Sequence, residues 1–471
     1  MDELLFGGIT GSDSMAKVKE IEKALTVGYG MEPTTQTGFG ALRYESLERT
    51  LKEMSAKTQD ATFFNAMRKG KAYSTVEEFA TLNEVGSAGF YSEGGLPPEW
   101  DEDIRREFEQ VKYIGAVGKV PIPAQMTKQV ANSIDTITRA KAAAIIRSCD
   151  VNMHFGDSTK VPTAWNGYLA QFNARAKYPT ENTIDLRGKR LTPENINTAG
   201  SIIRENYGNG ANLKLWIGNT AWENYTDELL MNKRFMVGTS EARSVIASAD
   251  KFKVGNAQGN IETDIFLRHK GETYLDRLYP KLNTANTAFA STHSDAPVTL
   301  AAGVCTATVE ADAVGLLDAG TYDYAFLAIN KFGASAAFEI KSVVCAANKK
   351  VTFVISDNGS PTGKEATSFE IYRKLSSDTA LTSYRFLVSF ASSASVKVDN
   401  GGHVPGTTYG FLYDWDFDQV VDFKQLLPMV KMPLATIDDS IRWLQKQYGV
   451  PLLYNPNKMV VFKNMGDTPS A

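Results

Sequence analysis

The sequence predicts an α+β fold that is interrupted by an inserted all-β sandwich. Helical patterns and short strands are mixed as far as about residue 295, which is typical of an α+β domain. From about Ala296 to Pro405 the pattern changes to short strands of period two, separated by turns. After Pro405 the earlier character returns. We therefore expect the sandwich to lie within a host domain, with its two ends close together.

Length and composition indicate a folded protein with more than one core. A chain of 471 residues favours about two to four domains. Hydrophobic residues make up 43% of the chain and charged residues 22%, as in folded proteins. The 50 basic and 54 acidic residues give a net charge of -4, which excludes a strong positive field for tight or sequence-specific binding of nucleic acid. Weak contact with DNA stays open.

Neither a membrane span, nor export, nor disulfide bonding is indicated. No apolar run approaches the roughly 18 residues of a membrane span, and the amino end lacks the basic flank of a signal peptide. We therefore expect no membrane partner and synthesis in a cytosol. The three cysteines, Cys149, Cys305 and Cys345, are odd in number and not spaced for zinc. We expect them to be small buried apolar side chains.

The first part of the chain predicts an arm followed by a long two-stranded excursion. Residues 1–60 are polar and punctuated by glycine, which favours an arm over a domain. Residues 61–112 contain a strand-like stretch from Lys71, a glycine-rich middle, the pair Pro97-Pro98, and an alternating return strand from Phe108 to Ile114. Glycine and proline interrupt strand pairing. We therefore expect the tip of the excursion to be loose.

One long amphipathic helix is predicted from Gln125 to Asn152. Its apolar positions recur at spacings of three and four. They are Met126, Val130, Ile134, Ile137, Ala140, Ala144, Ile145 and Cys149. We expect the helix to end at His154-Phe155-Gly156, with Gly156 in the left-handed conformation that closes many helices.

A second helix, a strand and a third helix are predicted after this one. Thr192-Pro193-Glu194 combines a capping side chain, a proline at the first helical position and an acid in the first turn. Leu213 to Ile217 predicts a strand, and Ala221 to Met231 a helix. Gly255 to Asn260 favours a β-turn over a phosphate-binding loop, because Ile261 to Leu267 predicts a strand where such a loop requires a helix.

The segment from 296 to 405 predicts about seven short strands and hence a β-sandwich. The stretch from Gly320 to Gly333 resembles a strand and turn of fibronectin type III or immunoglobulin-like domains. Its aromatic residues could stack on sugars, but their strict alternation favours a role in the core. These aromatic residues are Tyr322, Tyr324, Tyr372, Tyr384 and Phe386.

The last part of the chain predicts scaffold rather than chemistry. Two prolines interrupt the apolar run from Leu426 to Leu434, which excludes a helix interior there. Asn455-Pro456-Asn457 predicts a turn that leads into a short buried strand, Met459 to Phe462. The segment from Ile441 to Tyr448 stays open between a helix, which its apolar spacing favours, and a strand.

No catalytic, cofactor or metal site is predicted. The four histidines lack metal-binding spacing, and the chain has neither a Gly-x-Ser-x-Gly nor a Walker-type motif. Acidic residues cluster beside Arg105 and Arg106, and a pair of them could in principle serve a glycosidase. Exposed charge runs are usually solvated, so we favour a strand entry whose charges pair with a neighbouring subunit. The acidic cluster comprises Glu99, Asp101, Glu102, Asp103, Glu107 and Glu109.

Three short blocks, in this order along the chain, resemble the major capsid proteins of tailed bacteriophages with the Hong Kong 97-like fold. The first runs from Gly28 to Arg43, and the second is Phe155-Gly156-Asp157-Ser158. The third spans Leu426-Leu427-Pro428-Met429, the Tyr448-Gly449 step and Pro456-Asn457-Lys458 before the last strand. The resemblance is greatest to capsid proteins of large contractile-tailed phages that carry an immunoglobulin-like or fibronectin-like insertion.

This resemblance implies a structural protein, not an enzyme, and a role for each segment. Residues 1–60 would be the amino-terminal arm, 61–112 the extended loop, and 113–160 the peripheral domain with its spine helix. Residues 161–295 would form the axial domain, 296–405 the insertion, and 406–471 the return to both domains. Copies would assemble as hexamers and pentamers in the host cytoplasm and enclose double-stranded DNA in a virion. A scaffolding protein, a portal and a maturation protease would be partners.

Contacts between subunits are expected in the charged run and the preceding strand. The candidates are Lys69, Lys71, Glu99, Asp101, Glu102, Asp103, Arg105 and Arg106. The lysine-to-asparagine crosslink of part of the family is not expected, because residues 83–98 contain no lysine. Two alternative functions stay open: a nanocompartment shell of the same fold, and an extracellular carbohydrate-binding or adhesive protein with a fibronectin-like module.

Overall fold

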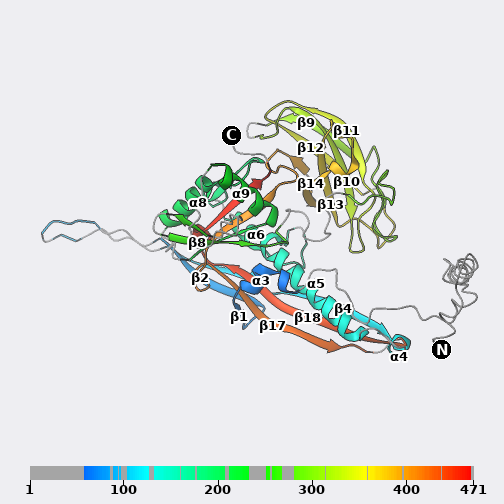
Figure 1. Cartoon of the computed structure of the whole chain (residues 1–471), viewed down its shortest axis with the longest axis horizontal. Coiled ribbons are helices and arrows are strands. Elements are labelled where there is room, and N and C mark those ends of the chain that lie inside the picture. Colours follow the sequence, from blue (N-terminus) through cyan, green and yellow to red (C-terminus); the bar gives the residue numbers. More distant parts are fainter. Residues whose placement is uncertain are drawn as a thin grey trace, which may run out of the picture. The chain divides into compact units, whose positions relative to one another are not determined.

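The computed structural model describes residues 58–84, 89–93, 95–96, 103–126, 132–159, 161–175, 178–206, 212–232, 251–254, 257–267, 280–312, 315–357, 359–394, 397–435 and 438–467. The described residues from 58 to 124 and from 134 to 467 belong to one compact unit (Figure 1). Most of the predicted arm, and the first block of family resemblance, lie outside the described residues.

A six-stranded sheet forms the centre of the host domain. Its strand order is β5-β19-β16-β6-β8-β7, and the pairs β5–β19 and β6–β8 are parallel. The strands are β5 (Thr183–Asp185), β6 (Leu213–Ile217), β7 (Lys251–Val254), β8 (Ala257–Thr263), β16 (Thr408–Asp414) and β19 (Met459–Met465). Because β16 and β19 follow residues 296–405 in sequence, parts of the chain on both sides of that segment share one sheet.

Helices cover both faces of this sheet. On one face, α8 (Pro193–Glu205) and α9 (Asn219–Asn232) pack against Leu412, Val460 and Phe462. On the other, Phe411, Tyr413 and Val461 join a core with residues of α3 (Thr62–Ala66), α5 (Ser133–Phe155) and α6 (Tyr168–Asn173). The short helices α4 (Ile122–Met126), α7 (Tyr178–Glu181), η2 (Thr58–Asp60), η3 (Leu381–Ser383) and η4 (Pro456–Lys458) lie in connections.

A second sheet of the host domain runs along the long helix α5 (Figure 1). Its strands are β1 (Lys69–Lys71), β17 (Val421–Pro433), β18 (Ser440–Leu453) and β4 (Lys112–Pro121), in that order. The amide nitrogen of Gln445 donates to the carbonyl of Thr138 in α5 at 3.1 Å, and the Lys431 ammonium donates to the Thr138 hydroxyl at 3.1 Å. The inner face of the sheet is thereby tied to the helix.

The insertion contains two facing sheets. One has the order β11-β10-β13-β14 and the other β15-β12-β9. The strands are β9 (Cys305–Ala311), β10 (Gly320–Ile329), β11 (Phe338–Cys345), β12 (Lys349–Ile355), β13 (Ser368–Leu375), β14 (Arg385–Ala391) and β15 (Lys397–Asp399). Tyr324 and Phe326 from one sheet and Phe353 from the other meet in a common core. The five aromatic residues that the sequence assigned to the core are all buried.

The outer face of the first insertion sheet is also covered. Ala325 and Leu327 of β10 pack in a second cluster with Tyr372 and Tyr384, against which Phe289 lies. The backbone of Thr292 also donates to the carbonyl of Ala334 at 2.9 Å. Residues from Pro280 onward therefore already belong to the packing of the insertion, ahead of the boundary at 296 that the strand pattern predicts.

The structure corrects three details of the sequence-based elements. The long helix begins at Ser133 instead of Gln125 and ends at Phe155. Gly156 is not in the left-handed region, so close packing rather than backbone handedness requires a glycine there. The strand expected to end at Leu267 ends at Thr263, because Asp264 accepts the backbone N–H of Phe266 at 2.9 Å and turns the chain.

Several other elements are confirmed. Thr192 caps α8 by accepting the backbone N–H of Asn195 at 3.3 Å, with Pro193 at the first helical position. Asn455 accepts the N–H of Asn457 at 3.1 Å ahead of β19. The segment Ile441–Tyr448 is a strand within β18, as the capsid resemblance implies. The three cysteines are free and buried.

Candidate assembly surfaces and the pocket beside the spine helix

The hairpin formed by β2 (Val76–Glu84) and β3 (Asp103–Gln110) presents an apolar face to solvent. Leu82 pairs with Ile104, and Glu78 pairs with Phe108, so these side chains lie on one side of the hairpin. Leu82, Ile104 and Phe108 are 56%, 67% and 64% exposed. Arg106 and Glu78 lie on the same side, so their ion pair interrupts the apolar row. Exposed apolar side chains that gather on one face mark contact surfaces in soluble proteins.

The opposite face of the hairpin is fixed to the body of the protein. The ring of Phe79 packs edge-on against Tyr454, with 5.0 Å between ring centroids. Glu107 forms an ion pair with Arg175, and Glu109 accepts a hydrogen bond from the Asn166 amide at 3.2 Å. Burial raises the pKa of Glu109. Because one face is held in this way, the apolar face is left available for another molecule.

The predicted charged candidates on β3 pair within the hairpin. Arg106 forms an ion pair with Glu78 across the two strands at 3.4 Å, and Arg105 forms one with Asp103 in its own strand at 3.0 Å. All four side chains are at least 38% exposed, so these pairs contribute little to stability. The other acidic candidates, Glu99, Asp101 and Glu102, lie outside the described residues.

The two lysine candidates lie in a different sheet. Lys69 and Lys71 belong to β1, which pairs with β17 and not with the hairpin. The Lys69 ammonium donates to the carbonyls of Phe64 and Asn65 at the end of α3, and burial lowers its pKa. Lys71 is exposed and lies 5.2 Å from the ring centroid of Tyr73. Within one chain these lysines do not lie beside the charged run, and their expected contacts with a neighbouring subunit stay a prediction.

A second exposed apolar row crosses the four-stranded sheet on the face away from α5. Val117, Leu444 and Met432 pair in register across β4, β18 and β17, and Val117 and Met432 are 52% and 39% exposed. In the same sheet Tyr113 pairs with Tyr448, with 4.5 Å between ring centroids. This row is a further candidate for contact with another copy of the chain.

The loop from Gly156 to Gly167 folds back onto the end of α5. Gly167 donates its backbone N–H to the carbonyl of Gly156 at 2.9 Å, which closes the loop. A Cβ atom at Gly156 would lie 2.5 Å from the carbonyl oxygen of Asn152, and one at Gly167 would lie 2.6 Å from the same atom. Only glycine permits this approach. The Phe-Gly-Asp-Ser block of family resemblance is therefore the start of a tightly folded loop.

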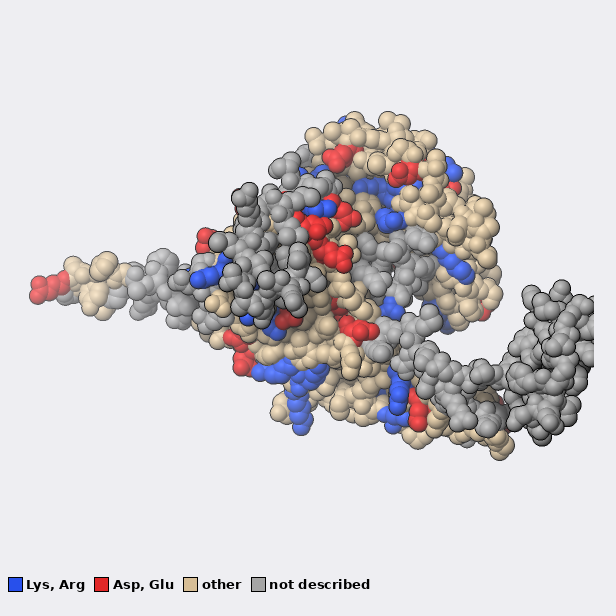
Figure 2. Space-filling model, viewed as in Figure 1, with Lys and Arg blue, Asp and Glu red and all other residues tan. Residues whose placement is uncertain are grey.

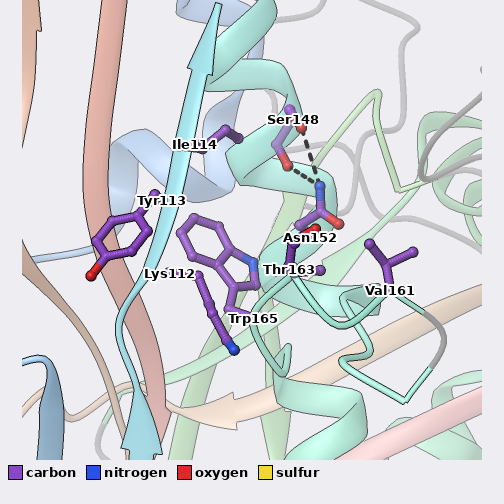
Figure 3. A pocket seen from close by; sticks show the side chains of 9 residues that line it. Lys112, Tyr113, Ile114, Ser148, Asn152, Val161, Thr163 and Trp165 are labelled. Carbon is purple, nitrogen blue, oxygen red and sulfur yellow. Dashed lines mark hydrogen bonds between the residues drawn. The ribbon is translucent and has the colours of Figure 1, made fainter. Parts of the chain in front are cut away.

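This loop and α5 enclose a pocket of about 150 Å³ next to the base of the hairpin (Figure 3). Its walls come from the start of β4, the last turns of α5 and the loop. The lining residues are Lys112, Tyr113, Ile114, Ser148, Asn152, Val161, Thr163, Ala164 and Trp165. The Lys112 ammonium is held by the Gln110 side chain at 3.1 Å and the Pro162 carbonyl at 3.3 Å. The sequence interpretation missed this pocket, although Asn152, a polar residue in the buried part of the helix, was a usable signal.

Buried titratable groups of the host core serve packing. His154 stacks on Phe411, with 4.6 Å between ring centroids, and burial lowers its pKa to about 3, so the imidazole is neutral. Asp150 and Asp264 are buried together, and burial raises the pKa of both carboxyl groups. Asp150 accepts the backbone N–H of Phe64 at 2.6 Å, which links α5 to α3.

Within the described ranges, no group of three or more His, Cys, Asp or Glu side chains is arranged to hold a metal ion. None of the described helices is long and apolar enough to cross a membrane. Acidic and basic residues are interspersed over the face seen in Figure 2, in agreement with the nearly balanced charge of the chain. The described surface features are thus apolar rows and short-range ion pairs.

Comparison with known proteins identifies relatives along most of the chain. The major capsid protein of Staphylococcus phage K is 24% identical over 463 residues, which cover 95% of each chain. That of Staphylococcus phage S25-3 is 24% identical over 464 residues, with the same coverage. No protein-family model matches. Among solved structures, the capsid of a native GTA particle has a TM-score of 0.49 at 7% identity, covering 92% of this chain and 99% of that one. A Mycobacterium phage Adephagia chain has a TM-score of 0.43 at 9% identity, covering 92% and 97%.

Proposed function

We propose that this chain, a phage major capsid protein with a Hong Kong 97-like fold, assembles its icosahedral shell by laying the apolar face of hairpin β2–β3 on neighbouring copies. The protein is structural and not an enzyme. The observation that carries the proposal is the exposed row of Leu82, Ile104 and Phe108 on a hairpin whose other face is anchored. Fully burying one such side chain is worth roughly 1.5–3 kcal/mol. Repeated around each capsomer, contacts of this size close a shell.

The apolar face is tested by Ile104→Ser and Phe108→Ser, alone and together. We expect the purified variants to stay folded by circular dichroism, because both side chains are largely exposed, and to form few or no shells by electron microscopy. Leu375→Ser is a matched control, since Leu375 is 50% exposed but lies in the insertion. Shells from the double variant at the yield of the parent protein would contradict the proposal.

The charged candidates are tested by reversal and exchange. If Arg105 and Arg106 contact a neighbouring copy, reversing both to glutamate abolishes assembly without unfolding the monomer. The exchange Glu78→Arg with Arg106→Glu keeps the pair that the hairpin makes internally but reverses the sign at each position. Loss of assembly in the exchange variant supports an intersubunit role. Normal shells from both variants would show that Arg105 and Arg106 make their contacts only within the hairpin.

Each segment has a proposed place in the shell protein. Residues 1–60 form the amino-terminal arm and 61–112 the extended loop. Residues 113–160 form the peripheral domain, supported by α5 as its spine, and 161–295 form the axial domain. Residues 406–471 complete the peripheral and the axial domain. This is supported by β16 and β19, which lie in the six-stranded sheet, and by β17 and β18, which lie in the four-stranded sheet with β4. Hydrogen–deuterium exchange before and after assembly tests this division, with new protection expected in 61–112.

The insertion at 296–405 is proposed to be an immunoglobulin-like or fibronectin-like sandwich on the outer face of the shell. Its two facing sheets around one aromatic core support the sandwich. An inward insertion would occupy volume that the genome needs. Two roles compete, additional contacts between capsomers and weak adhesion to sugars on the host surface. Deleting residues 297–404 separates them: loss of shells supports contacts, whereas normal shells with weaker adsorption to host cells support adhesion.

The protein assembles with itself into capsomers, and further partners are proposed. Hexamers and pentamers, built with a scaffolding protein and a portal and matured by a protease, enclose double-stranded DNA that binds without sequence preference. The net charge of -4 excludes a strong positive field, so the proposed contact with DNA is weak. Nuclease-protected DNA inside purified particles tests this and distinguishes a virion from a nanocompartment shell. Monomers in place of particles would favour the adhesive alternative.

A further inference from the structure

A lysine and an aspartate are buried side by side in the sheet β11-β10-β13-β14. Asp323 of β10 and Lys374 of β13 pair directly across the two central strands of this sheet. The side chains of Lys374 and Asp323 are 5% and 6% exposed, and the Lys374 Nζ atom lies 3.6 Å from the Asp323 Oδ2 atom. A strong charge-assisted hydrogen bond is shorter, at about 2.7–2.9 Å. The two groups are therefore held close together away from water, without the contact that best offsets their loss of solvation.

An aromatic ring covers this pair. The Lys374 ammonium lies 5.0 Å from the centroid of the Tyr384 ring, which is fully buried in the cluster that contains Ala325. Burial, the hydrogen bond to Glu339 and the nearby Asp323 carboxylate raise the pKa of Tyr384. A site without water lowers the free energy of a neutral amine and a neutral acid relative to that of two ions. Transfer of one proton within the pair gives these two neutral groups.

Two hydrogen-bond donors converge on the other carboxyl oxygen of Asp323. Its Oδ1 atom accepts the backbone N–H of Ser342 at 2.9 Å and the hydroxyl of Ser376 at 2.8 Å. Donors placed in this way stabilise the negative charge that an oxygen carries when a nucleophile adds to the carbon beside it. The Oδ2 atom lies on the side of Lys374 and is the atom that departs. The carboxyl group is thus arranged as the acyl centre of a condensation reaction.

The backbone is distorted where it supplies one of these donors. The register of β10 against β11 shifts between Tyr322 and Tyr324, so two residues of β11, Lys341 and Ser342, lie opposite Asp323. Ser342 has a φ of 58°, in the left-handed region that residues other than glycine seldom adopt. Such conformations cost free energy and gather at functional sites. Here the strained residue directs its N–H at the carboxyl group.

We propose that Lys374 and Asp323 of the same chain condense to an amide bond that links β13 to β10. A proton passes from the ammonium to the carboxylate, the neutral Nζ atom attacks the Cγ atom, and the Cγ–Oδ2 bond breaks with release of one water molecule. One ammonium and one carboxylate thus become one amide and one water, without a co-reactant. The carbonyl of Asp378 accepts from the Lys374 Nζ atom and orients it, and the flexible lysine stem allows the remaining movement.

Mass spectrometry of the purified full-length chain tests this bond without any substitution. We expect the denatured chain to be lighter than its sequence by one water molecule. Trypsin should release residues 282–331 and 374–385 as one branched peptide, because both segments are bounded by lysine or arginine. Lys364 and Asp295 are an internal control: they lie closer, at 2.7 Å, but are at least 38% exposed, and they should stay unlinked. A full intact mass with two separate peptides overturns the proposal.

Two variants test the roles of the amine and of one donor. Lys374→Arg keeps a cation beside Asp323, but a guanidinium stays protonated in proteins, so this variant should have the full mass of its sequence. Ser376→Ala keeps both reacting groups and removes one donor from Oδ1. We expect it to slow formation of the bond about a hundredfold, measured by mass spectrometry at intervals after synthesis. A missing water in Lys374→Arg overturns Lys374 as the amine, and an unchanged rate in Ser376→Ala overturns the role of Ser376.

Discussion

Arg68 holds Asp422 through two nitrogens, although 354 residues separate them in the chain. The Nε atom lies 3.3 Å from one carboxylate oxygen and an Nη atom 3.0 Å from the other. The second Nη atom contacts Asp418 at 2.6 Å. Asp422 is buried and is the second residue of β17, whereas Arg68 directly precedes β1. This pair therefore fixes the parallel start of β1 against β17.

Removing the guanidinium should destabilise the unassembled protein. We expect Arg68→Ala to lower the free energy of unfolding by about 1–2 kcal/mol, because it leaves the buried Asp422 carboxylate without its charged partner while the exposed side of Arg68 is screened by water. Chemical denaturation with far-UV circular dichroism measures this. Lys119→Ala, which removes an exposed ion pair with Asp438, should change little. An Arg68→Ala variant as stable as the parent would contradict the account.

Close packing at the 156–167 loop makes its two glycines irreplaceable. Gly156→Ala and Gly167→Ala each place a Cβ atom within about 2.6 Å of the Asn152 carbonyl oxygen, and we expect each to cost about 1–3 kcal/mol through overpacking. Gly320→Ala is the control, because the nearest atom to its Cβ would lie at 3.4 Å. Thermal unfolding of the three variants measures the difference, and equal melting temperatures would refute the packing argument.

The buried carboxyl pair should make stability fall as pH rises. Burial raises the folded-state pKa of Asp150 and Asp264 above the unfolded value of about 3.9. Their contribution is therefore fully present below that value and is lost as pH rises through the folded pKa. Asp150→Asn keeps an acceptor for the Phe64 N–H and removes the charge. We expect it to be more stable than the parent at pH 8, by about 1 kcal/mol.

The control for this prediction is a carboxyl group whose pKa is shifted in the opposite direction. Hydrogen bonds from Lys119, Ser440 and Arg442 lower the pKa of Asp438, so its contribution is present above the unfolded pKa and lost in acid. Asp438→Asn should therefore reduce the loss of unfolding free energy between pH 6 and pH 4. It should leave the change in unfolding free energy between pH 6 and pH 8 as in the parent. Denaturant titrations at pH 4, 6 and 8 for both variants are sufficient. A parent protein that grows more stable between pH 6 and 8 would argue against the carboxyl pair as the dominant group.

The cysteines should be unreactive until the protein unfolds. Burial raises the pKa of the Cys149 and Cys345 thiols, and that of Cys305 to about 12. Only the thiolate reacts with aromatic disulfide reagents. At pH 8 we expect no rapid reaction of the native protein and three equivalents in denaturant, measured by absorbance. Fast labelling of any cysteine in assembled shells would indicate a local opening of its core.

The sequence predicts the elements with strong local signals, and tertiary packing decides the others. The cap and proline at Thr192 and Pro193 locate a helix start without further information, and the alternation around Tyr324 identifies a buried strand. Ile441, Leu444 and Tyr448 have helical spacing, yet their segment is the strand β18, because it hydrogen-bonds to β17 on one side and β4 on the other. Its buried positions are partly polar, as with Gln445 and Gln447, so local periodicity gives the wrong signal.

The candidate contacts were predictable only in outline. Charge clustering located Arg105 and Arg106, but the pairing of Arg106 with Glu78 follows from strand register, which the sequence does not specify. The Lys69 ammonium donates to the Phe64 carbonyl at the end of α3, a contact within the chain that the charge pattern does not reveal. The exposed apolar face of the hairpin was missed, since Leu82, Ile104 and Phe108 form a row only once the two strands pair.

The strands between Thr408 and Met465 have a consequence for the timing of assembly in the cell. β16 and β19 fill the middle of one host sheet, and β17 and β18 fill the middle of the other. A nascent chain that has not yet emerged past these strands has two incomplete sheets, and β1 and β4 have no pairing partner. The row across β4, β18 and β17 then does not exist as a surface. Translation itself thus delays recruitment, so that only complete subunits become competent to join a growing shell.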